Sequence, residues 1–165
     1  MNPLVDELPL VRGAQLDHVA VAVHDAGESA KLFRDIMGAA FVSFGDNKEQ
    51  GFRFVQYRFP GGGKVELVTP IGEGFVSRFL DRRGEGVHHV TFKVTDLRSQ
   101  VDRLRAGGVD LIMVDLDDSH WREAFIHPKN AHGVLIQLAE SLDSEEEASR
   151  HLQDVFPEAA RLGLA

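Results

Sequence analysis

The sequence contains no cysteine among its 165 residues. This excludes a disulfide framework, a thiolate metal site and a cysteine nucleophile. No segment approaches the roughly 18 consecutive apolar residues that a membrane-spanning helix needs, and the N-terminus has no basic start followed by an apolar run, so we expect no signal peptide. The net charge of −8 argues against nucleic acid as a partner. We therefore expect a cytoplasmic, globular protein that binds neither nucleic acid nor membrane.

Two pairs of similar segments recur at one constant spacing. LDHVAVAVHD (16–25) resembles VHHVTFKVTD (87–96), which lies 71 positions further along the chain. GKVELVTP (63–70) resembles GVLIQLAE, which ends at residue 140, and Glu66 and Gln137 are again 71 positions apart. Internal similarity at a fixed offset indicates a duplicated structural module.

Each copy predicts one strand, one helix and three further strands. Strand-like alternation in the first copy ends at Asp25, a plausible N-cap, and Ala30, Phe33 and Met37 then follow at helical spacing. Asp96 holds the matching position before the second helix. The other strands are expected at 40–45, 52–59, 64–70, 109–116, 122–128 and 133–140. The sequence thus predicts an α+β fold in which two β-α-β-β-β modules form a cup-shaped, eight-stranded mixed sheet.

The predicted domain covers residues 16–140. Module one spans 16–70, a linker helix spans 71–85 and module two spans 86–140. The remaining stretch, 141–165, is expected to be a helical tail, because Ser144 followed by three glutamates is a typical helix start. The tail is either a helix packed on the outside of the domain or a dimer contact or lid.

Four residues at matched positions of the two modules predict a metal site: His18, Glu66, His89 and Gln137. If the modules are related by a pseudo-two-fold axis, these side chains converge on that axis. Imidazole nitrogen suits Zn, Fe, Co or Ni, and the oxygen donors also admit Mn. Glu66 lies among apolar residues, and a buried carboxylate must be paired, protonated or metal-bound. His88 alternates to the opposite face of its strand from His89 and is not expected to be a ligand.

Five stretches carry a resemblance to a known family: LDHVAVAV, EQGFRF (49–54), VELVTP, FLDRRGEGVHHVTF (79–92) and FIHPKNAHGVLIQL (125–138). Over about residues 16–140 the chain resembles the vicinal oxygen chelate (glyoxalase/bleomycin resistance/dioxygenase) superfamily, and most closely its methylmalonyl-CoA epimerase-like members. The resemblance implies one divalent metal ion held at His18, Glu66, His89 and Gln137. It also implies a small carbonyl compound or an acyl-CoA as substrate, and a homodimer.

The sequence departs from the epimerase pattern at two positions. Epimerases of this kind use two glutamates on opposite faces of the substrate's acidic carbon, and here Phe54 and Gln137 stand at those positions. Neither a phenyl ring nor an amide is a useful base near neutral pH. Glu66 is therefore the candidate catalytic base.

Three functions remain open from the sequence. The first is a metal-dependent isomerase, epimerase or lyase that stabilises an enolate. The second is a non-haem iron dioxygenase, because two histidines and one carboxylate are the minimum iron(II) triad. The third is a ligand-binding or resistance protein without catalysis, which the loss of both expected bases favours.

Overall fold

The computed structural model describes residues 10–165. The N-terminal segment, for which no signal peptide is predicted, includes residues 1–9, and these lie outside the described residues. The described chain divides into two compact units, one with residues 17–90 and 143–165 and the other with residues 10–16 and 91–142. Within the described part, no helix has the length and apolar character needed to cross a membrane.

The unit containing residues 17–90 holds three whole strands and most of two others, in the order β2-β3-β4-β1-β5. β1 runs parallel to β4, whereas β3 is antiparallel to both β2 and β4. The strands are β1 (Gln15–Ala22), β2 (Ala40–Asn47), β3 (Phe52–Arg58), β4 (Lys64–Pro70) and β5 (Gly86–Lys93), and the linker helix is α2 (Phe75–Arg83).

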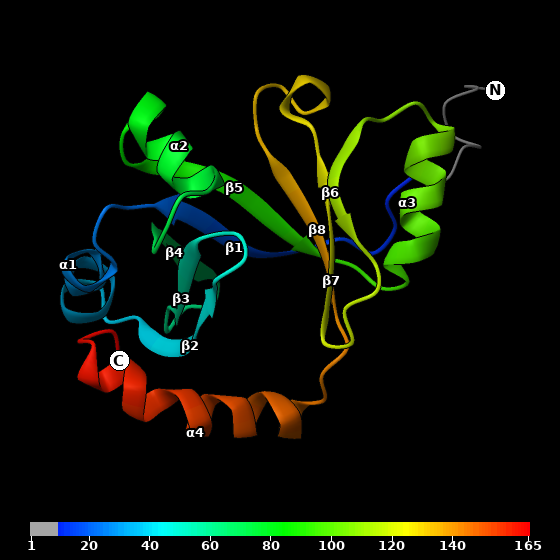
Figure 1. Ribbon diagram of the computed structural model, residues 1–165. Coiled ribbons are helices and arrows are strands. Elements are labelled where there is room, and N and C mark those ends of the chain that lie inside the picture. The colour runs from blue at the N-terminus through cyan, green and yellow to red at the C-terminus, as the bar shows by residue number, and fades with distance from the viewer. Residues whose placement is uncertain (1–9) are drawn as a thin grey trace. The chain divides into compact units, whose positions relative to one another are not determined.

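The other unit has the strand order β5-β8-β7-β6, with antiparallel β6–β7 and β7–β8 pairs. Its helix α3 (Leu97–Ala106) packs against these strands through Leu97, Val101 and Leu104 (Figure 1). Its strands are β6 (Leu111–Asp115), β7 (Trp121–Ile126) and β8 (Ile136–Ser141), and a 3-10 turn, η2 (Pro128–Asn130), precedes β8. The predicted α+β class and the eight-stranded mixed sheet are confirmed.

The helix starts follow the side chains that the sequence indicated. The carboxylates of Asp25 and Asp96 accept N–H hydrogen bonds from the first turns of α1 and α3. Ser144 forms a capping box with Glu147 at the start of α4 (Glu145–Arg161). Each cap satisfies N–H groups that have no partner within the helix.

The first helix departs from regular α-geometry. α1 spans Ala26–Ala30 and continues as a π-helical turn, η1 (Lys31–Ile36). Met37 closes this turn by donating its N–H to the carbonyl five residues earlier, at 3.0 Å. The wider turn changes the direction of the residues that follow it. Met37, which was expected at helical spacing after Ala30 and Phe33, lies just beyond this turn and is 51% exposed.

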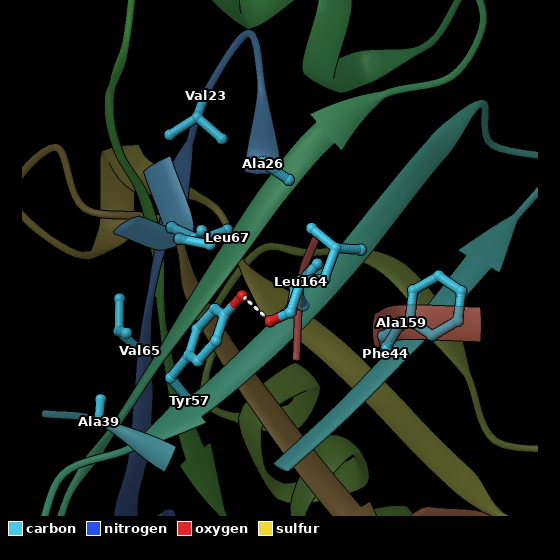
Figure 2. Close-up of a cluster of buried hydrophobic side chains, with 11 residues drawn as sticks. Val23, Ala26, Ala39, Phe44, Tyr57, Val65, Leu67, Ala159 and Leu164 are labelled. Atoms are coloured by element: carbon cyan, nitrogen blue, oxygen red, sulfur yellow. Dashed lines mark hydrogen bonds between the residues drawn. The ribbon is translucent and has the colours of Figure 1, made fainter. Parts of the chain in front are cut away.

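The C-terminal tail contributes to the hydrophobic core of its own unit. α4 lies alongside β2, and Ala159 and Leu164 are buried with Leu67 and Phe44. The only tyrosine, Tyr57, is fully buried and donates its hydroxyl to the carbonyl of Leu164 at 2.6 Å, as Figure 2 shows. Burial raises the pKa of Tyr57 to about 12. These contacts agree with a tail packed on the domain.

Tyr57→Phe is expected to lower the free energy of unfolding by about 1–3 kcal/mol, because it leaves the buried Leu164 carbonyl without its donor. Urea denaturation at neutral pH measures the change. The control is Arg34→Met, which removes one hydrogen bond each to the carbonyls of Gly163 and Ala165 and the ion pair with Asp35. Equal effects of the two variants would contradict a special role for the buried bond.

Candidate metal centre

Three of the four predicted ligands come together within the unit that contains residues 17–90. His18 on β1, Glu66 on β4 and His89 on β5 are all buried, and their ligand atoms lie within 4.8 Å of one another. His18 Nε2 is 3.6 Å from Glu66 Oε2, and His89 Nε2 is 3.9 Å from Glu66 Oε1. Such distances are too long for good hydrogen bonds. They suit donors that share one ion, which takes such ligands at about 2.0–2.2 Å.

Strand register explains why His18 and Glu66 meet. In the parallel β1–β4 pair, His18 lies opposite Lys64 and Ala20 lies opposite Glu66. Residues two apart in a strand share a face, so His18 and Glu66 project from the same side of the sheet. The residue opposite Glu66 is an alanine, which leaves room for the carboxylate to reach the imidazoles.

The electrostatics of the cluster favour a charged carboxylate. Burial by itself raises the pKa of Glu66, but the adjoining imidazoles of His18 and His89 and the amide of Gln56 outweigh it, and the pKa lies below its usual value. Burial lowers the pKa of His18, but the carboxylates of Asp17 and Glu66 outweigh this and raise it. Both shifts share one cause, the close approach of the Glu66 carboxylate to the imidazoles. A divalent ion at this place would also favour the ionised carboxylate, and it would require neutral imidazoles.

A shell of polar side chains orients these three residues, and sequence reasoning missed it. Asp17 lies 2.7 Å from His18 Nδ1 and 2.7 Å from the ammonium of Lys64, which is itself only 8% exposed. Gln56 on β3 donates its amide to Glu66 Oε2 at 2.7 Å. Asp17 directly precedes His18, and that adjacency is the one signal in the sequence that pointed to this shell.

Gln137 belongs to the other unit, where it is buried on β8. Thr91 donates its hydroxyl to Gln137 Oε1 at 2.5 Å, and Gln137 Nε2 donates to Glu123 Oε2 at 2.6 Å. Trp121 donates its indole N–H to the same carboxylate oxygen at 3.2 Å. The role of Gln137 as a fourth ligand stays a prediction. Glu123, on the neighbouring strand β7, is a carboxylate that the sequence pattern did not single out.

An apolar side chain occupies the position where the epimerase pattern has its first glutamate. Phe54 on β3 packs into a hydrophobic cluster with Val68 and Phe75. It also covers Gly45 on β2, where an added Cβ would lie 2.7 Å from the phenyl ring. A side chain at this cross-strand position would therefore displace the Phe54 ring.

His88 contacts the site from outside. Its ring lies 5.2 Å from the ring of Phe75 and 4.9 Å from that of Phe79, both on α2. Its Nδ1 is 2.9 Å from Nδ1 of His89. Burial lowers the pKa of His88. By contrast, His127 accepts the N–H of Lys129 and caps η2.

Known proteins resemble this chain over most of its length. The profile of the Glyoxalase/Bleomycin resistance protein/Dioxygenase superfamily matches residues 17–126. An ethylmalonyl-CoA/methylmalonyl-CoA epimerase of Cereibacter sphaeroides is 31% identical over 129 residues, which cover 75% of this chain and 96% of that protein. The mitochondrial methylmalonyl-CoA epimerase of Dictyostelium discoideum is 32% identical over 132 residues, covering 76% of this chain and 78% of that protein.

Solved structures give the same result. The methylmalonyl-CoA epimerase of Mycobacterium tuberculosis superposes with a TM-score of 0.72 at 34% identity, covering 87% of this chain and 97% of that chain. A Streptomyces coelicolor methylmalonyl-CoA epimerase variant in complex with 2-nitronate-propionyl-CoA has a TM-score of 0.70 at 28% identity, covering 78% and 98%. The matched profile and these similarities show that this chain belongs to the glyoxalase/bleomycin resistance protein/dioxygenase superfamily.

Proposed function

We propose that this protein is a divalent-metal-dependent enzyme that stabilises an enolate on an acyl-CoA or another small carbonyl substrate, in the manner of an epimerase, isomerase or lyase. The observation that carries the proposal is the buried His18–Glu66–His89 cluster, in a chain about 30% identical to methylmalonyl-CoA epimerases. His18, Glu66 and His89 are the proposed ligands, with Gln137 as the fourth. The resemblance also supports a homodimer.

The donor set suits a Lewis-acid site. Two imidazoles and one carboxylate are donors for Co, Zn, Ni, Mn or Fe, and they leave coordination positions open. A bound divalent ion supplies electrostatic stabilisation of the negative charge that develops on a substrate carbonyl oxygen. The buried Asp17–Lys64 pair and Gln56 hold the ligands in place before substrate arrives.

Glu66 is the proposed base. Its carboxylate is ionised and buried, so it can accept a proton from the carbon next to a carbonyl and return it. The amide of Gln56 holds one of its oxygens and limits its rotation. Glu123 is a second candidate for proton transfer, because its carboxylate accepts a hydrogen bond from Gln137. Gln137 stands at the position where the epimerase pattern has its other glutamate.

Two other functions each rest on one observation. The two-histidine, one-carboxylate cluster is the donor set of non-haem iron(II) dioxygenases. A ligand-binding or resistance protein without catalysis is supported by Phe54 and Gln137, which stand where the epimerase pattern has bases. Metal identity and proton exchange distinguish these functions from the proposed one.

The purified protein is expected to bind one divalent ion per chain. The substitutions His18→Ala and His89→Ala should each weaken Co²⁺ binding, because each removes a proposed ligand. The loss should exceed the roughly 10–100-fold that follows when a residue hydrogen-bonded to a ligand is removed. Titration with a competing chelator gives the affinity. His151→Ala, an exposed histidine on α4, is the control and should bind as the wild type does.

Elemental analysis of protein purified without added metal separates the three functions. Co, Ni, Zn or Mn supports the enolate enzyme, and iron supports the dioxygenase. A protein that neither retains metal nor binds Co²⁺ would contradict both and favour the binding protein.

Wild-type protein loaded with Co²⁺ is expected to incorporate solvent deuterium into methylmalonyl-CoA, and Glu66→Gln should slow this by about 10²-fold or more, because it removes the base. NMR of the substrate follows the exchange. Glu158→Gln, an exposed carboxylate on α4, is the matched control. Exchange no faster in the wild type than in Glu66→Gln would sink the proton-transfer proposal for this substrate.

Exchanging the carboxylate of Glu123 and the amide of Gln137 tests whether Glu123 transfers a proton. Gln137→Glu alone places two carboxylates about 2.6 Å apart, where like charges repel. The double variant Gln137→Glu with Glu123→Gln keeps one carboxylate and one amide and restores the epimerase pattern at residue 137. We expect faster deuterium incorporation in the double variant than in either single variant. No gain over the single variants would contradict a role for this pair in proton transfer.

A further inference from the structure

Both ligand histidines are held at Nδ1 by the residue that precedes them. Asp17 lies 2.7 Å from Nδ1 of His18. His88 takes the equivalent place beside His89, with the two Nδ1 atoms 2.9 Å apart. The carboxylate of the first module thus corresponds to an imidazole in the second, at the same offset in the repeat. His88 did not stand out in the sequence, because it alternates away from the ligand face.

The Nδ1–Nδ1 contact can hold only one hydrogen between its two nitrogen atoms. A nitrogen that carries no hydrogen accepts, so one of the two histidines must donate and the other must accept. His89 directs Nε2 toward Glu66, at 3.9 Å. A neutral imidazole that offers Nε2 to a metal carries its hydrogen on Nδ1. His89 is then the donor, and His88 must present a bare Nδ1.

The position of the accepting ring is fixed by α2. His88 packs against Phe75 at 5.2 Å and Phe79 at 4.9 Å, with its ring tilted or edge-on to theirs. These two rings contact His88 from one helix turn, because residues four apart lie on one side of a helix. Phe75 also packs on Phe52 of β3, at 5.0 Å. The linker helix thereby holds the acceptor that orients a ligand.

We propose that His88 is a positioning residue that fixes the tautomer and ring orientation of His89, so that Nε2 points at the metal. This inference rests on the proposed metal centre, and it assigns His88 as the hydrogen-bond partner of the ligand His89. The two histidines then differ in how strongly Nε2 can donate its electron pair to the metal. Asp17 is an anionic acceptor for His18, whereas His88 is a neutral acceptor for His89, and a hydrogen bond to a charged group is the stronger one.

Two variants separate hydrogen bonding from packing. His88→Phe keeps an aromatic ring between Phe75 and Phe79 but removes the acceptor. His88→Asn removes the ring but can place its side-chain oxygen where Nδ1 was. We expect His88→Phe to weaken Co²⁺ binding by about 10–100-fold, the usual effect of losing an outer partner. His88→Asn should recover most of that affinity, although it packs less well.

The measurements are the Co²⁺ dissociation constant, the visible absorption spectrum of the Co²⁺ protein and the melting temperature of the metal-free protein. Imidazole ¹⁵N shifts of the Zn²⁺ protein report which nitrogen of His89 carries hydrogen, and this should be Nδ1 in the wild type. Lys129→Met, which breaks an exposed ion pair with Asp110, is the control and should leave all four readouts unchanged.

The outcomes distinguish the positioning role from the metal centre itself. Wild-type protein that binds Co²⁺, with His88→Phe binding equally well, overturns the positioning role and leaves the metal centre intact. His88→Asn binding as weakly as His88→Phe shows that an acceptor oxygen at this place does not restore binding, and it also overturns the positioning role. Should His88→Phe fail to fold, His89 protonated on Nε2 in wild-type protein would overturn the proposal. Wild-type protein that binds no Co²⁺ overturns the metal centre and this inference together.

Discussion

The carboxylate of Glu66, buried between the imidazoles of His18 and His89, is the constraint on which the site depends. A buried charge without a partner is costly, and a neighbouring amide alone does not offset that cost. Two imidazoles within 4 Å and the Gln56 amide stabilise the charged form, as the lowered pKa of Glu66 shows. The surrounding polar groups keep these three side chains facing one another.

The need to orient these side chains explains two unusual features of this unit, a buried ion pair and an enclosed histidine. Lys64 is a nearly buried ammonium, and Asp17 is the carboxylate that pairs with it while holding His18. Breaking a buried pair by removing one partner leaves an uncompensated charge. The same logic accounts for His88, whose ring is enclosed by aromatic side chains yet has a polar contact to His89. The rigidity of the cluster thus comes from residues outside it.

The position of the carboxylates distinguishes this chain from the epimerase pattern that it otherwise resembles. Phe54 covers Gly45 and places a phenyl ring, which cannot take a proton, where the pattern has a glutamate. The carboxylate that the pattern has at residue 137 is an amide here, and it is hydrogen-bonded to Glu123 on the adjacent strand. Substitutions of this kind keep the fold and alter which groups can move protons, so family membership and activity are separate questions.

The sequence by itself determined the strand and helix order and singled out the three residues of the cluster, because period-two alternation and a constant offset of 71 can be read directly along the chain. It did not determine the π-turn that exposes Met37, nor the partners Lys64, Gln56 and His88. Those contacts depend on strand register and on how α2 packs, and both are set by residues far apart in the chain. Tertiary structure therefore decided how the three clustered side chains are oriented, whereas the sequence had already singled them out.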